Sequence, residues 1–185
     1  IGAILVAMLW PQVRRLGIDR CRKWGLAIAY VAFVYGTVPL MPKVWAALST
    51  HSQGSIGYAG VLAVIVIGVT VLVGVVRRVG ASSWIPYVAL ALISAAYGYL
   101  LMEFSLFPAE RLHLVEYGFV GFFLYRALRL DTGRNRAYAV SFCLTVVIGI
   151  GDELIQLMLP QRFFEIKDVQ LNALSAGLGL ILWRV

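Results

Sequence analysis

Four residues that can exchange protons or hold a polar ligand lie close together near the middle of the chain. His113, Glu116 and Tyr117 follow Glu110 at intervals of three, six and seven residues. This spacing places all four on one face of an α-helix. Carboxylates beside an imidazole are suited to general acid and base catalysis. The segment therefore predicts a polar helix face that could do chemistry or bind a ligand.

Two further polar groups occur later in the chain, each at helical spacing. Gln156 follows Asp152 by four residues, with Glu153 next to Asp152, and Asn172 follows Asp168 by four residues. Residues four apart share a helix face. Three separate segments therefore each present polar side chains on one side.

The surrounding sequence indicates that these segments cross a membrane. The chain has 185 residues, of which 61% are hydrophobic and only 14% are charged. Soluble domains have about 45–50% apolar and about 25% charged residues. The apolar residues form continuous runs about as long as a helix needs to cross a ~30 Å hydrocarbon core. Because the runs do not alternate with polar residues, they favour helices over barrel strands.

We predict an all-α fold: a polytopic transmembrane bundle of about six helices with short loops, forming a single domain over residues 1–185. The expected spans are residues 24–41, 56–76, 84–102, 112–130, 137–159 and 169–185. Residues 1–10 are apolar but too short to span, so they are expected to form an interfacial helix or the remainder of a longer span. Small residues spaced four apart in the last span, such as Ser175 and Gly179, favour close packing between helices of the bundle.

Charges in the loops predict the orientation. The net charge is +7, and the basic residues concentrate before residue 24, after residue 76, at residues 126–136 and at Arg184. Positively charged loops stay on the cytoplasmic side, which places both termini there. The basic residues stand between apolar runs, so we expect contact with membrane lipids and none with nucleic acid. Most of the acidic residues then fall toward the extracytoplasmic side.

Acidic residues inside a span are costly, and this predicts where they point. A charged side chain at the centre of a bilayer costs about 2.5–3.5 kcal/mol. Such residues should face the bundle interior, find partners such as His113, Arg111, Arg162 or Lys167, or be partly protonated. We therefore predict a polar pocket on the extracytoplasmic side, formed by the last three spans. Its candidate residues are Glu110, Arg111, His113, Glu116, Tyr117, Asp152, Glu153, Gln156, Arg162, Asp168 and Asn172.

The same residues carry a resemblance to a known family. The chain contains in order His113 and Tyr117 four apart, Asp-Glu-x-x-Gln at 152–156, Pro-x-Arg at 160–162 and Asp-x-x-x-Asn at 168–172. This series resembles the VanZ-like family of small bacterial membrane proteins, and the match covers about residues 110–179. Many members have Lys three residues before the His, where this chain has Glu110 followed by Arg111. An arginine cannot replace a lysine there without a change in geometry.

The resemblance implies a multi-pass protein of the bacterial cytoplasmic membrane, in a family named after a protein linked to resistance to the glycopeptide teicoplanin. It implies no reaction, so the catalytic residues and the status as an enzyme stay open. The pocket could bind or act on a cell-envelope or lipid-linked molecule. Alternatively, the polar residues could only fix helix packing in an accessory subunit of a larger membrane complex. A small transporter is less favoured, because no span is broken near its middle.

Other ligands are less well supported. No spacing typical of a metal site is present, and no cofactor is expected. Tyr30 and Tyr35, in the first span, are expected to face lipid and not a bound pigment or quinone.

Overall fold

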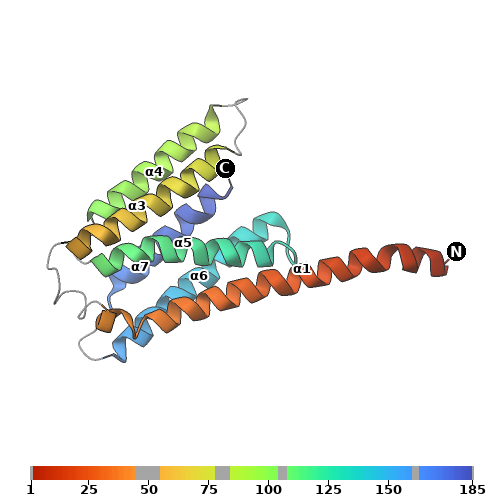
Figure 1. Cartoon of the computed structure of the whole chain (residues 1–185), viewed down its shortest axis with the longest axis horizontal. Helices are drawn as coiled ribbons and strands as arrows, with labels where there is room; N and C mark the ends of the chain where they lie inside the picture. The colour runs from red at the N-terminus through yellow and green to blue at the C-terminus, as the bar shows by residue number, and fades with distance from the viewer. Residues whose placement is uncertain (1, 45–54, 78–83, 104–107, 160–162, 185) are drawn as a thin grey trace.

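The computed structural model describes residues 2–44, 55–77, 84–103, 108–159 and 163–184; it describes their side chains except those of residues 2–16, 55–61, 63, 64, 103 and 108–112. All regular secondary structure in these ranges is helical, as predicted. The helices, shown in Figure 1, are α1 (Gly2–Thr37), α3 (Ser55–Val76), α4 (Ile85–Glu103), α5 (Pro108–Leu128), α6 (Arg134–Leu157) and α7 (Ile166–Leu182).

Five of the helices lie close to the predicted apolar spans. Helix α3 begins one residue before the predicted span and ends where predicted, and α4 begins and ends one residue after the predicted bounds. Helices α5, α6 and α7 begin a few residues earlier, because polar residues such as Arg134 and Lys167 continue the helix beyond the apolar run. Hydrophobicity marks the part suited to lipid, and the helical backbone extends past it.

Helix α1 differs most from the prediction. It runs without interruption over 36 residues, from Gly2 to Thr37. Residues 2–10 are therefore continuous with the predicted first span and do not form a separate helix. The basic residues between them are good helix formers. The helix ends before Pro39, because the residue that precedes a proline disfavours helical geometry.

Helix α5 is the central helix of the bundle. It packs against α7, α6, α1 and α3, and α4 packs mainly against α7. Figure 1 shows α5 between α3 on one side and α1 on the other. The main apolar core surrounds it and includes Val34 of α1, Val120 and Leu124 of α5, Ala137 of α6 and Leu180 of α7. Side chains on several faces of α5 are thus held by neighbouring helices.

Small residues bring α5 and α7 close together. A Cβ atom added to Gly179 would lie 2.8 Å from the Cα of Gly118. One turn before Gly179, the Ser175 hydroxyl donates a hydrogen bond to the Leu114 carbonyl. The prediction that Ser175 and Gly179 pack inside the bundle is confirmed.

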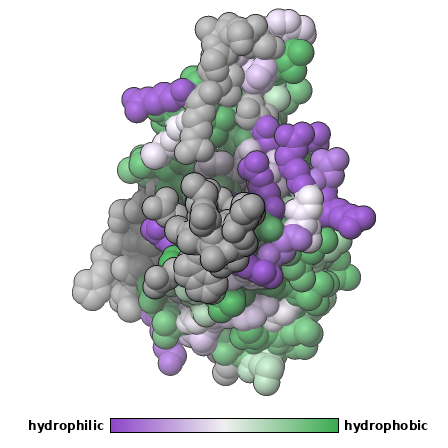
Figure 2. Space-filling model, turned by 90° about the vertical axis from the view of Figure 1, so that its right-hand side faces the viewer, coloured by the Kyte–Doolittle hydropathy of each residue, from purple (hydrophilic) through white to green (hydrophobic). Residues whose placement is uncertain are grey.

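At one end of the bundle, which we call the basic end, the connection between α5 and α6 contacts α1. Arg20 Nε lies 2.9 Å from Asp131 Oδ1, and Trp24 Nε1 donates a hydrogen bond to Asp131 Oδ2 at 2.9 Å. Figure 2 looks toward this side of the molecule and shows hydrophilic side chains grouped beside apolar surface. In Figure 1, α1 continues past the bundle on the same side. Exposed arginines of this end include Arg20, Arg22, Arg126, Arg129, Arg134, Arg136 and Arg184.

The outer faces of the helices are apolar. Exposed large side chains include Val66 of α3, Leu92 of α4 and Val147 of α6. By length and composition, two stretches in the described part of the chain could each cross a bilayer: Ile85–Met102 in α4 and Arg134–Leu157 in α6. A shorter apolar stretch, Ile65–Val76, lies in α3.

Candidate functional site

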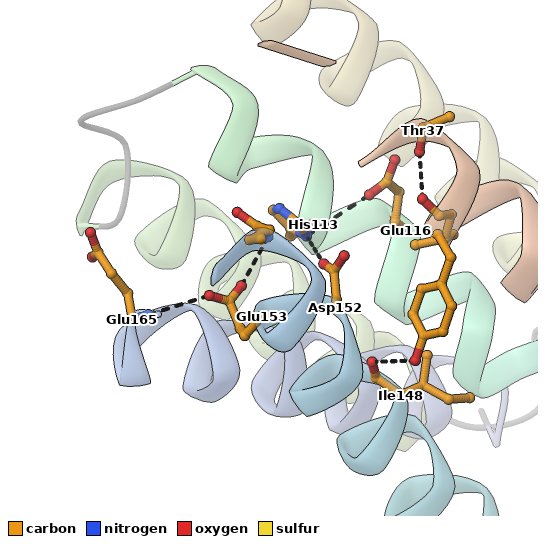
Figure 3. A network of polar contacts seen from close by, with 10 residues as sticks. Thr37, His113, Glu116, Ile148, Asp152, Glu153 and Glu165 are labelled. Carbon is orange, nitrogen blue, oxygen red and sulfur yellow. Dashed lines mark hydrogen bonds and ion pairs between the residues drawn. The ribbon is translucent and has the colours of Figure 1, made fainter. Parts of the chain in front are cut away.

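The end of the bundle opposite the basic end holds His113 and the acidic side chains of the predicted pocket, and we call it the acidic end. There the start of α5 meets the last turns of α6. His113 Nδ1 lies 3.6 Å from Asp152 Oδ2 and 3.9 Å from Glu116 Oε2 (Figure 3). The imidazole stacks on the ring of Tyr117, with centroids 5.8 Å apart. The helical spacing of the sequence therefore brings His113, Glu116 and Tyr117 together, and the fold adds Asp152.

Asp152 is fully buried where α5, α6 and α7 meet. Its side chain has 0% exposure, as does the side chain of Asn172 on α7. The approach of the three helices depends on Gly149, one turn before Asp152. A Cβ on Gly149 would lie 3.1 Å from the Asn172 Cβ and 3.4 Å from the Tyr117 Cε1. Gly149 is thus a positioning residue that the sequence analysis did not identify.

Glu153 has a different role from its neighbour Asp152. Adjacent residues on a helix point about 100° apart, so the two carboxylates face different partners. Gln156 Nε2 donates a hydrogen bond to Glu153 Oε1 at 3.0 Å, and the Glu165 backbone N–H donates to Glu153 Oε2 at 3.3 Å. Figure 3 shows this link between the end of α6 and the segment that begins α7. Glu153 therefore stabilises the connection between these two helices.

One polar group beside the His113–Asp152 pair has no hydrogen-bond partner among the described residues. It is the side-chain amide of Asn172, which is buried. Leaving a buried donor or acceptor unsatisfied costs about 1–3 kcal/mol. Native proteins rarely keep such groups without a reason, and a bound molecule is one such reason. The amide is suited to hydrogen bonds with hydroxyl, amide or sugar groups.

Tyr30 and Tyr35 of α1 do not face lipid, contrary to the expectation from sequence. The Tyr35 hydroxyl donates a hydrogen bond to the Ile148 carbonyl on α6 at 2.8 Å. The ring of Tyr30 packs on Phe123 of α5, with centroids 5.0 Å apart. Both tyrosines therefore turn inward, because α1 packs against α5 and α6.

The remaining predicted site residues lie at the start of α7 or are not described. Asp168 lies in the first turn of α7 and is half-buried, whereas Lys167 is exposed. The side chains of Glu110 and Arg111, and all of Arg162, lie outside the described part. The structure thus brings together His113, Glu116, Tyr117, Asp152 and Asn172, with Glu153 and Gln156 in the adjoining link.

The cluster can act chemically in two ways. An imidazole next to a buried carboxylate can accept or deliver a proton, and its charge responds to its surroundings. The same groups can instead hold a polar ligand. Among the described residues, no set of three or more His, Cys, Asp or Glu side chains is arranged to bind a metal ion.

These features define an all-helical bundle with apolar outer faces and an ionisable cluster buried at one end. The sequence model of the VanZ/LLP1 family matches residues 27–185. The match covers most of the chain, so the protein belongs to the VanZ/LLP1 family. Comparison with curated proteins and with solved structures finds no match.

The family assignment confirms the resemblance and extends it. The motifs that carry the resemblance lie within residues 110–179, whereas the family match begins at Ala27 in α1. The last part of α1, with α3 and α4, therefore belongs to the family match, although these sequences carry few polar residues that could act as motifs.

Proposed function

We propose that the protein is a multi-pass protein of the bacterial cytoplasmic membrane, with about six spans and both termini in the cytoplasm. The separation of charge supports this orientation. Arg20, Arg126 and Arg184 belong to the basic end, and His113 and Asp152 belong to the acidic end. Positively charged segments remain on the cytoplasmic side. The acidic end then lies toward the extracytoplasmic side.

In this orientation the cluster binds or acts on a cell-envelope or lipid-linked molecule. One observation carries this proposal: the buried Asn172 amide lies without a hydrogen-bond partner among the described residues, beside the His113–Asp152 pair and Tyr117. Such a group can bind a hydroxyl- or amide-bearing headgroup, while His113 can take or give a proton. A part in glycopeptide resistance belongs to this proposal by resemblance to the VanZ-like family alone.

A second role, helix packing in an accessory subunit, is favoured by Glu153. Its carboxylate accepts hydrogen bonds from Gln156 and from the Glu165 backbone, so it holds the bundle together. Buried polar networks of this kind can specify a unique packing. If Glu153 serves only in packing, a ligand contacts only the polar groups on the face of α6 that carries Asp152.

Gentle purification of the full chain tests the proposal. We expect a lipid-linked molecule to co-purify with the native protein and to be lost in Asp152→Asn, which keeps the size of the side chain. Glu165→Gln is the matched control, because Glu165 is exposed and only its backbone contacts the cluster. A stoichiometric partner complex that survives in Asp152→Asn, with no bound small molecule in either protein, would establish the accessory role instead.

A further inference from the structure

Two cavities lie along α5 and adjoin each other. The first, the apolar cavity, has a volume of about 280 Å³ and lies between α3, α4, α5 and α7, where Leu72, Ile93, Gly98, Leu101 and Leu114 line it. The second, the aromatic cavity, has a volume of about 360 Å³ and lies between α1, α3 and α5. Ile67, Val115 and Phe119 line both cavities. The two cavities are therefore neighbours along α5.

The aromatic cavity contains one carboxylate in apolar surroundings. Glu116, Phe119 and Phe123 follow each other at helical spacing on α5 and line one wall, and Tyr30 of α1 lines another. The three rings form a cluster, with centroids between 5.0 and 6.4 Å apart. His113 Nδ1 lies 3.9 Å from the Glu116 carboxylate, which is beyond hydrogen-bond distance.

A carboxylate beside aromatic rings selects a positively charged organic group. Ring faces attract an ammonium group, and the attraction strengthens where water is excluded. The same carboxylate repels an anionic group, most strongly in surroundings of low polarity. The adjoining apolar cavity, in contrast, suits a hydrocarbon chain. The two cavities together are complementary to an amphiphile with a cationic head.

We propose that the joined cavities bind a membrane lipid whose headgroup ends in an ammonium group. The ammonium lies against Glu116, Tyr30, Phe119 and Phe123, and one acyl chain lies in the apolar cavity. This inference rests on the proposed function, because it requires the chain to span the membrane. It deepens that function by naming the lipid class that approaches the His113–Asp152 pair. Glu116 connects the two, because it lines the aromatic cavity and also lies beside His113.

The headgroup is tested by lipid competition. The purified full chain is incubated with equal amounts of phosphatidylethanolamine and phosphatidylglycerol of identical acyl chains, and bound lipids are counted by native mass spectrometry. We expect a preference for phosphatidylethanolamine in the native protein and a loss of about tenfold in that preference in Glu116→Gln. Glu165→Gln should keep it. An unchanged preference in Glu116→Gln, or no preference in the native protein, overturns the assignment of the headgroup.

A second variant distinguishes a specific loss of headgroup selectivity from misfolding. Phe119→Leu keeps an apolar side chain but removes one ring, so it should weaken the preference for the ammonium lipid. Thermal unfolding in the same detergent verifies that both variants remain folded. A folded Phe119→Leu protein with the full preference contradicts the role of the rings.

The acyl chain is tested by filling the apolar cavity. Gly68 of α3 lines that cavity, and a Cβ added there meets nothing within 4 Å. Gly68→Leu should therefore reduce the total amount of bound lipid at least severalfold while the fold is kept. Gly74→Leu is the matched control, because Gly74 lies on the same helix with equally open space but does not line the cavity. Equal lipid binding by the two variants overturns the assignment of the acyl chain to the apolar cavity.

Asp152→Asn separates this inference from the proposed function. Loss of the lipid-linked molecule in Asp152→Asn, with ammonium selectivity unaffected by Glu116→Gln, leaves the function standing and overturns the inference. Selectivity that depends on Glu116, in a protein whose bound molecule is indifferent to Asp152, supports the inference and contradicts the function.

Discussion

Gly118 on α5 and Gly179 on α7 meet backbone to backbone. A Cβ on Gly179 would lie 2.8 Å from the Gly118 Cα and 3.0 Å from the Gly118 carbonyl oxygen. The Ser175 hydroxyl reaches the Leu114 carbonyl one turn away, and the Tyr97 hydroxyl of α4 donates to the Ser175 carbonyl at 3.2 Å. The relative position of α5 and α7 is therefore set by backbone contact.

Gly179→Ala should reduce the stability of the fold. The added methyl group has no room, because the neighbouring atoms belong to backbone and cannot rotate away. We expect a loss of about 1–3 kcal/mol in the free energy of unfolding, measured by denaturation in detergent. Gly177→Ala on the same helix is the control, since its Cβ would make an ordinary 3.6 Å contact with Phe142. Equal stability of the two variants would contradict the contact.

His113 and Asp152 should be energetically coupled. His113→Ala and Asp152→Asn each remove one partner of the 3.6 Å pair, so the second substitution should cost less once the first is present. A double-mutant cycle of unfolding free energies should give a coupling of about 0.5–3 kcal/mol. The cycle of His113→Ala with Glu165→Ala should be additive. Strict additivity in the first cycle would show that the pair contributes nothing to stability.

Glu153→Ala should loosen the start of α7. The Glu165 backbone N–H loses the carboxylate that accepts its hydrogen bond, so this amide should exchange with deuterium about tenfold faster. Hydrogen exchange with site-resolved mass spectrometry measures the rate. Glu165→Ala removes the exposed side chain but leaves the bonded N–H, and should change the exchange little. Equally fast exchange in both variants would contradict a specific role of the Glu153 carboxylate.

Cysteine labelling should distinguish the two ends. Cys21 is exposed near the basic end, and in a Cys143→Ala background it should react only with reagents that reach the cytoplasm. Phe163 is exposed near the acidic end. Phe163→Cys, in a chain without Cys21 and Cys143, should react with an impermeant maleimide added to intact cells. Labelling of both positions from one side would contradict the proposed orientation.

Much of the fold is predictable because apolar runs and helices nearly coincide in this chain. Helices α3 and α4 are bounded by polar or proline-containing segments, so their ends fall where hydropathy changes. Helix α1 is not predictable in this way. Its basic residues interrupt the apolar run, but the helix continues through them because arginine and lysine favour helical geometry.

The polar cluster is predictable where it depends on spacing within one helix. His113, Glu116 and Tyr117 share a face by periodicity alone, and the cost of burying acids directs Asp152 toward them. The contributions of Gly149 and Tyr30 are not predictable from sequence. Both depend on which helices pack against each other, and the spacing of residues along one helix does not determine this.

The separation of the arginines from the acidic cluster has an electrical consequence in the proposed orientation. A bacterial membrane is negative inside, and a charge that crosses the whole potential changes energy by about 2.3 kcal/mol per 100 mV. The field draws the arginine-bearing end inward, which reinforces the direction of insertion. A cation that moves from the outer face toward Glu116 travels down part of the same field. Occupancy at Glu116 should then rise when the membrane is polarised and fall when an ionophore collapses the potential.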